Sequence, residues 1–219
     1  MEEDLFMKRM TCPVCTTDFK SPKVRRSKYF VSKVDTDFCT YYKRENPLFY
    51  NVHICPVCGY GFTEKFPPPN DAAKEEIMNH FSKFTLDFSG QRSINLALLA
   101  YWRAFECAQI QNTKKILLAG LMLHVAWLYR FQGDLESETK CMNESLDFYN
   151  EAFEKDSDSG NPAMTLYVMG ELNRRLGKDR EAILCFTSII NDKKIRDAGI
   201  IRMARERWQD MRGTSQTLF

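Results

Sequence analysis

Four cysteines with the spacing of metal ligands stand out among the residues that could do chemistry. They form two copies of Cys-Pro-Val-Cys, one at Cys12 and Cys15 and the other at Cys55 and Cys58. Two such pairs can be a disulfide set, a redox couple or the two halves of a metal site. We predict one structural Zn²⁺ held by all four, because a shell of four thiolates leaves no open position for water or substrate.

A second candidate site lies between the two pairs, in the segment DTDFC. Asp35, Asp37 and Cys39 alternate, so their side chains would share one face of a strand. Such a face could bind a ligand, or serve a redox sensor or enzyme centred on Cys39. The alternative is that Cys39 is a buried thiol packed under the sheet. His53, two residues before Cys55, could replace a metal ligand or bind the outer shell of the ion, and the alternative is a partly buried strand histidine. No nucleophile, base and orienting group are found together, so we expect a protein that is not an enzyme.

Composition and charge narrow the functional classes. The chain of 219 residues is 44% hydrophobic and 27% charged, which is typical of a globular protein. Its net charge of +2 gives no overall electrostatic attraction that would require a nucleic acid or a membrane as partner. The acidic start MEEDLF lacks the layout of a secretory signal, and the apolar run ILLAGLMLHVAWLY is too short to cross a bilayer. We therefore expect a cytoplasmic protein with no membrane partner, in which disulfides are rare.

One stretch of the chain is much more basic than the rest. Residues 20–33 carry six Lys or Arg side chains and no acid, and they include Tyr29 and Phe30. Beside a zinc module, such a stretch could follow a nucleic-acid backbone. The alternative is a solvated strand face whose charge is balanced by the thiolates nearby.

The composition changes sharply at FPPPND. The sequence predicts an α+β, mostly α protein with three parts: a zinc-ribbon-like β module at 1–66, a Pro-rich linker at 67–70 and a helical domain at 71–219. Asn70 or Asp71 would cap the first helix. We expect residues 71–219 to fold without the zinc module, because contacts between helical repeats are local.

The helical part carries a repeat of helix, Gly-containing turn and helix that is typical of tetratricopeptide pairs. Gly170, Gly177, Ala182 and Phe186 fall at the spacing of that pattern, and the chain ends in an amphipathic helix. A generic helical bundle is the alternative. The inner helices of a repeat stack line a groove, and the register predicts that four side chains face a protein or peptide partner there: Trp127, Arg130, Glu171 and Arg174.

Five segments together resemble a bacterial family known as a domain of unknown function: TCPVC, DTDFC, NPLFY, CPVCGY and FSGQRS. The resemblance covers nearly the whole chain and implies the same four cysteine ligands, but no activity. Our leading hypothesis is a zinc-stabilised adaptor that binds a partner protein through its helical-repeat surface. A nucleic-acid-associated factor that uses the basic zinc module is the alternative, followed by the Cys39-centred sensor or enzyme.

Overall fold

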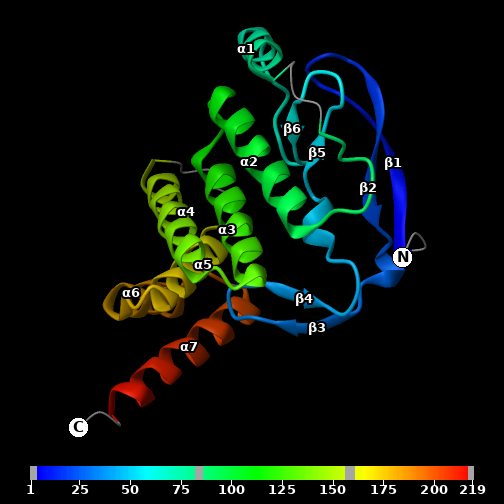
Figure 1. Cartoon of the computed structure of the whole chain (residues 1–219). Helices are drawn as coiled ribbons and strands as arrows, with labels where there is room; N and C mark the ends of the chain where they lie inside the picture. The colour runs from blue at the N-terminus through cyan, green and yellow to red at the C-terminus, as the bar shows by residue number, and fades with distance from the viewer. Residues whose placement is uncertain (1–3, 82–85, 156–160, 217–219) are drawn as a thin grey trace. The chain divides into compact units, whose positions relative to one another are not determined.

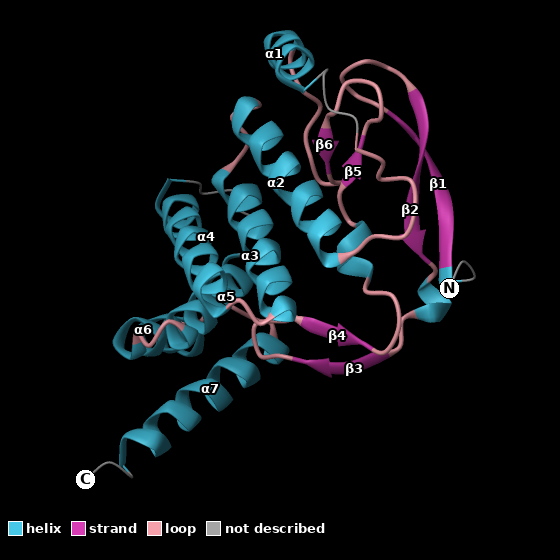
Figure 2. Cartoon of the chain, in the orientation of Figure 1, coloured by secondary structure: helices cyan, strands magenta, loops and turns pink. Residues whose placement is uncertain are grey.

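The computed structural model describes residues 4–81, 86–155 and 161–216 and shows a strand-rich first part followed by helices (Figures 1 and 2). The strands are β1 (Leu5–Thr11), β2 (Asp18–Val24), β3 (Val31–Val34), β4 (Thr40–Tyr42), β5 (His53–Ile54) and β6 (Gly61–Phe62), with 3-10 helices η2 (Arg26–Lys28) and η3 (Pro47–Tyr50) between them. The helices are α1 (Asp71–Phe81), α2 (Ile94–Ile110), α3 (Lys115–Gln132), α4 (Leu135–Lys155), α5 (Pro162–Arg175), α6 (Asp179–Asn191) and α7 (Ala198–Gln216). The predicted α+β, mostly α class is confirmed.

The strands form three separate antiparallel pairs: β1 with β2, β3 with β4, and β5 with β6. Each pair is a hairpin of two neighbouring strands, so its register is set by a local turn. Isolated two-stranded hairpins are marginal in water, and these need support from outside the hairpin.

That support comes from helices α1 and α2, which share a core with the strand region. Tyr60 and Phe62 from the second Cys hairpin are buried with Ile77 and Phe81 of α1 and with Cys107 of α2. The chain forms two compact units, Met1–Cys141 and Met142–Phe219. The boundary between them lies well after the Pro-rich segment at 67–70. Residues 1–66 thus pack with the first helices, and the independent folding of residues 71–219 stays a prediction, taken up in the Discussion.

A buried arginine also links the strands to the start of α2. The Arg92 guanidinium donates to the backbone carbonyls of Phe49, at 3.0 Å, and Val52, at 2.7 Å. Its Cζ atom lies over the rings of Tyr50 and Phe88, 5.6 Å from each ring centroid. The predicted cap at the start of α1 is also present, since the Asn70 side chain accepts the Ala73 N–H at 2.8 Å.

The second unit contains a tight helical hairpin made of α5 and α6. Gly177, with φ of 72°, makes the turn between them in the left-handed conformation that glycine adopts at little cost. A Cβ placed on Gly170 would lie 2.6 Å from the Phe186 ring, so the small residue is needed for this close approach. Helix α7 packs on α6 and buries Ile200 and Ala204, as expected for an amphipathic helix. Among the described residues, no helix is both long and apolar enough to cross a membrane.

Candidate metal centre

The four predicted cysteine ligands lie together, at the tips of two matching hairpins. Cys12 and Cys15 are in the turn between β1 and β2, and Cys55 and Cys58 are in the turn between β5 and β6. The two turns have the same hydrogen bonds: Thr16 N–H donates to the Cys12 carbonyl at 3.0 Å, and Gly59 N–H donates to the Cys55 carbonyl at 3.0 Å. Each turn therefore directs two sulfurs to one side.

The distances fit a single tetrahedral ion. The Sγ atoms of Cys12 and Cys58 are 3.5 Å apart, as are those of Cys15 and Cys55, and all four sulfurs lie within 4.8 Å of one another. Four sulfurs at about 2.3 Å from a Zn²⁺ ion would be about 3.8 Å apart. The cysteines present thus fit a metal ion without rearrangement of the backbone.

The ionisations of these crowded thiols depend on one another. Hydrogen bonds from Cys12 and Cys58 hold the pKa of the Cys55 thiol far below its usual range, at about 2. The same contacts raise the pKa of Cys58, and the hydrogen bond to Cys55 raises the pKa of Cys12 to about 12. Four crowded sulfurs cannot all become thiolates unless a positive ion lies between them.

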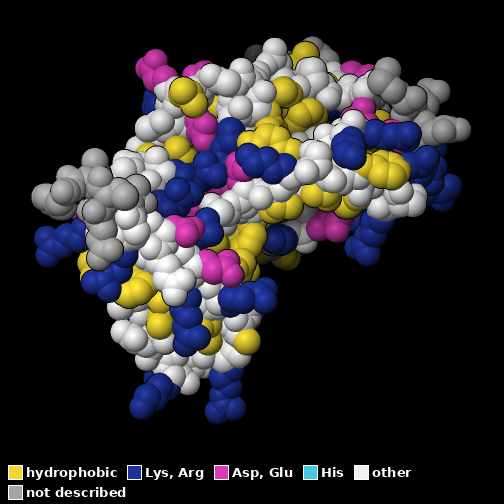
Figure 3. All heavy atoms as spheres, turned by 90° about the horizontal axis from the view of Figure 1, so that it is seen from below, with side chains coloured by type: hydrophobic (Ala, Val, Ile, Leu, Met, Phe, Trp, Pro, Cys, Tyr) yellow, Lys and Arg dark blue, Asp and Glu magenta, His cyan; other side chains and the backbone are white. Residues whose placement is uncertain are grey.

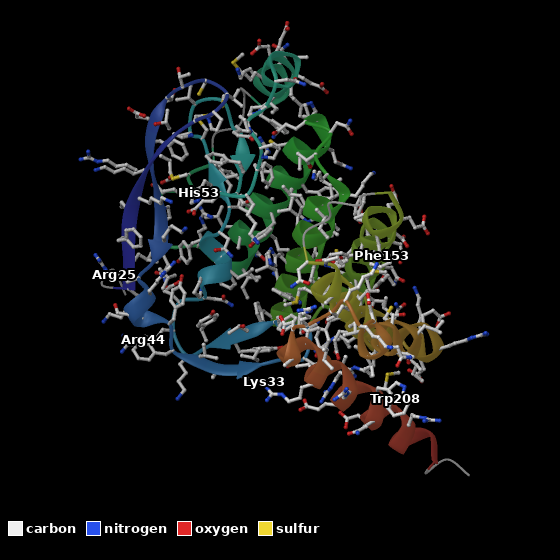
Figure 4. The ribbon with its side chains drawn as sticks, turned by 180° about the vertical axis from the view of Figure 1, so that it is seen from behind. Arg25, Lys33, Arg44, His53, Phe153 and Trp208 are labelled. Carbon is white, nitrogen blue, oxygen red and sulfur yellow. The ribbon has the colours of Figure 1, made fainter. Side chains whose placement is uncertain are left out.

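The surroundings of the cluster are closed and apolar. Cys12, Cys55 and Cys58 are buried, whereas Cys15 is partly exposed. His53 is fully buried in β5, where its Nδ1 is 2.8 Å from the Ser21 hydroxyl, and it is not one of the four clustered ligands (Figure 4). A shell of this kind suits a structural ion, since no ligand position is left open to substrate.

The DTDFC segment has a different structure from the one its alternation predicted. Asp35 to Cys39 form the turn between β3 and β4, so they do not share the face of a strand. Phe38 adopts a φ of 69°, and the Asp37 carboxylate accepts the Cys39 N–H at 3.3 Å. Cys39 is fully buried, in agreement with the interpretation of a packed thiol.

The two carboxylates of this turn bind side chains that the sequence had assigned to a partner groove. Arg130 lies 3.0 Å from Asp35 and 2.7 Å from Asp37, and it also pairs with Glu138 at 2.7 Å. The Trp127 indole N–H donates to Asp37 at 3.1 Å. Residues expected in two separate sites therefore form one ion-pair cluster inside the first unit, which engages Trp127 and Arg130 within the chain.

Burial and charge oppose each other at Arg130. Burial alone would lower the pKa of the guanidinium, but the Asp37 and Glu138 carboxylates raise it above its usual value, so Arg130 is charged at any ordinary pH. Sequence reasoning missed Glu138 as the third carboxylate. The available signal was an arginine at the end of an otherwise apolar helix, which needs a counter-charge once it is buried.

The other two residues of the predicted groove lie on α5 in the second unit. Arg174 Nη2 is 2.9 Å from Glu171 Oε2, and the two side chains are three residues apart on one helix face. Glu171 is fully buried, whereas about a third of the Arg174 side chain is exposed. Both residues belong to one helix, so this ion pair lies within α5.

Comparison with known proteins identifies the family to which the chain belongs. A family model described as "Uncharacterized protein conserved in bacteria (DUF2225)" matches residues 5–211, which is nearly the whole chain. No curated protein and no solved structure matches it. The resemblance noted from the five short segments is confirmed by this match.

Proposed function

We propose that the chain, which belongs to the bacterial DUF2225 family, is a non-enzymatic scaffold protein of the cytoplasm that is stabilised by one zinc ion and binds a partner protein. The observation that carries the proposal is the set of four cysteine sulfurs within 4.8 Å of one another. Thiolates in a tetrahedral arrangement select Zn²⁺, or less often iron, and a reducing compartment keeps them free of disulfides.

The proposed ion has a structural role. The hairpins β1–β2 and β5–β6 are too short to be stable alone, and the ion would join them at their tips. Structural zinc contributes on the order of 10 kcal/mol at neutral pH in small domains, which is enough to decide whether such a region folds.

Metal analysis of the purified full chain tests this assignment. We expect one zinc per chain, and we expect Cys55→Ser to lose it and to melt at a lower temperature. Cys185→Ser is the matched control, because Cys185 is a partly buried cysteine on α6 outside the cluster. Full zinc content in Cys55→Ser, or iron in place of zinc in the native protein, would refute the proposal.

The scaffold role is supported by the helical pairs. The α5–α6 hairpin has the close packing of Gly170 on Phe186 that tetratricopeptide pairs use, and a left-handed glycine, Gly133 with φ of 76°, separates α3 from α4. Because Trp127 and Arg130 are engaged within the first unit, we assign the partner surface to the second unit. Its described large hydrophobic side chains that remain exposed are Phe153, Met164 and Leu184.

Leu184 gives the sharpest test of the partner surface, since 60% of it is exposed on α6. In capture experiments with the tagged full chain, we expect Leu184→Asp to lose proteins that the native chain retains, at unchanged zinc content. Arg180→Ala, a change at an exposed residue of the same helix, should retain them. Equal capture by both variants would remove this surface from the proposal.

A further inference from the structure

Positive charge is concentrated on the β3–β4 hairpin and the residues that flank it. Residues 25–44 contain six Lys or Arg and two Asp, a net charge of +4, although the whole chain carries only +2. Both aspartates, Asp35 and Asp37, pair with Arg130, and Asp35 also pairs with Lys33 at 2.7 Å. Asp4, outside the segment, lies 3.3 Å from Arg44 and 3.9 Å from Lys28. The outer surface of this segment, which we call the hairpin platform, therefore presents more cations than acids.

Aromatic and aliphatic side chains on the platform stay exposed to solvent, although the Tyr29 ring meets the Tyr42 ring edge to face at 5.9 Å. Tyr29 is 41% exposed and Phe30 is 43% exposed, and the strand that follows exposes Val31 and Val34. All four residues of β3 are exposed, and β3 pairs only with β4 in its two-stranded sheet. Seen from below, the molecule shows Lys and Arg side chains directly beside hydrophobic ones (Figure 3). Large side chains that contribute little to the core call for another explanation.

The cations and rings of the platform are interleaved. Arg44 lies over the Phe30 ring at 5.0 Å, and Lys33 lies over the Tyr41 ring at 5.1 Å. Arg25, Arg44 and Lys33 follow one another along the strand side of the molecule (Figure 4). This arrangement alternates positive charge and ring faces at the surface, as a strand of phosphates and bases requires.

The platform continues into a hollow of about 350 Å³ with aromatic walls. Tyr41, Phe49 and Phe131 line it, and the ring centroids of Tyr41 and Phe131 are 5.1 Å apart. Arg44, Arg92 and Glu45 also line it, with the Glu45 carboxylate accepting the Tyr50 hydroxyl at 2.7 Å, and Arg92 is only 3% exposed. Within the described residues, Arg92 bonds backbone carbonyls and has no carboxylate in ion-pair distance, and its Nε has no hydrogen-bond partner. A buried cation without a counter-charge favours an anionic ligand beside it.

We propose that the hairpin platform binds single-stranded nucleic acid, with bases stacked on Tyr29, Phe30 and the aromatic hollow and with phosphates held by the arginines and lysines between them. A purely anionic surface, such as a lipid headgroup layer, would use the cations but not the ring-lined hollow. An extended peptide added to β3 would meet the bulge between Val31 and Lys33 and the Lys33 side chain, which protect strand edges from pairing. This activity goes beyond the scaffold role and does not depend on it.

Fluorescence anisotropy with the full, zinc-containing chain tests the proposal. The probes are labelled RNA and DNA single strands of about 15 nucleotides and the matching duplexes. We expect the single strands to bind more tightly than the duplexes, and the RNA and DNA arms show which of the two is preferred. With about four phosphates neutralised, affinity for a single strand should fall about 50-fold between about 50 and 200 mM salt.

Variants separate stacking from charge. Phe30→Ala and Tyr29→Ala should each weaken binding about tenfold or more at unchanged salt dependence, because each removes one stacking surface. Arg44→Ala should lower the slope of log affinity against log salt by about 0.7. Leu135→Ala, at a residue that is 73% exposed on α4, and Arg180→Ala, at an exposed residue of α6, are the matched controls and should bind as the native chain does.

Each contrary outcome removes the proposal. These outcomes are no binding of single strands at low salt, equal binding of duplexes, or full binding by the Phe30 and Tyr29 variants with native zinc content. Binding to vesicles of anionic lipid without binding to either oligonucleotide would assign the platform to a membrane surface instead. Zinc content is measured in the same samples, so a failure here leaves the zinc assignment separately testable.

Discussion

Arg130 and Asp37 are 93 residues apart in the sequence, yet Nη2 of the arginine lies 2.7 Å from Oδ2 of the aspartate. Asp37 is fully buried, and about a tenth of the Arg130 side chain is exposed. This pair, with Asp35 and Glu138 beside it, ties the turn of the β3–β4 hairpin to the C-terminal end of α3.

Removing the arginine should strongly destabilise the protein. Arg130→Met leaves three carboxylates without their shared cation, and breaking a buried ion pair in this way typically costs about 3–5 kcal/mol. Arg207→Met is the control, because Arg207 pairs with the largely exposed Asp210 and surface pairs contribute about 0–1 kcal/mol. Urea unfolding measures both, and equal losses in the two variants would contradict this account of the cluster.

The shared core of strands and helices makes a prediction about a shortened chain that starts at Pro69. Such a chain keeps Arg130, Trp127 and Tyr101 but lacks the groups that they contact: Asp37 for the first two and the Leu48 carbonyl for the third. We expect α2 and α3 to lose cooperative unfolding, as followed by circular dichroism. A cooperative transition like that of the full chain would instead support the boundary that the Pro-rich segment predicts.

The two matching turns of the metal centre offer a paired substitution. Thr16 has a φ of 59° where the other turn has Gly59, with a φ of 70°. Thr16→Gly removes the strain of a left-handed threonine, and stability should rise by up to about 1 kcal/mol after the entropy of glycine is counted.

The reverse change should be harmful. A Cβ on Gly59 would lie 2.9 Å from the Cβ of Phe81, so Gly59→Thr adds a clash to the strain and should cost about 2 kcal/mol or more. Thermal melts of the zinc-loaded proteins measure both variants. A gain from Gly59→Thr would show that the two turns are not equivalent.

His124 makes stability depend on pH. Burial, with Lys65 nearby, lowers its pKa from 6.5 to about 4, and its ring lies 5.0 Å from that of Trp127. Between those two pKa values the unfolded chain binds a proton that the folded chain does not, so stability falls as the pH drops from about 6.5 towards about 4. The fall should be at most about 3 kcal/mol.

A comparison of His124→Gln with the native chain isolates this contribution from other titrating groups. Urea unfolding between pH 7 and pH 5 should show a smaller loss of stability in the variant. Parallel losses in the two proteins would mean that His124 is protonated in the folded state as easily as in the unfolded one.

The parts of this structure that could be predicted are those with a local cause. Cys-x-x-Cys spacing depends on one turn, the Asn70 cap on one helix end, and the α5–α6 hairpin on glycines at fixed offsets. The ion-pair cluster could not be predicted, because the partners of Arg130 are set by where a distant hairpin packs. Alternation in DTDFC favoured a strand, but Phe38 with positive φ and the Asp37 bond to Cys39 N–H make a turn. Nothing in a single sequence distinguishes these two uses of short polar residues.

The positions of the two cysteine turns have a consequence for the order in which the first unit can assemble. Cys15 and Cys55 are 40 residues apart, and the chain between them includes the whole β3–β4 hairpin with Asp35 and Asp37. A metal ion that joins the two turns thus acts as a cross-link, and closing a ring of that size removes about 4 kcal/mol of chain entropy from the unfolded state. The β3–β4 hairpin inside that ring then has fewer conformations to search before Asp35 and Asp37 meet Arg130. A chelator would therefore slow the formation of the Arg130 cluster, even though no atom of that cluster touches the metal.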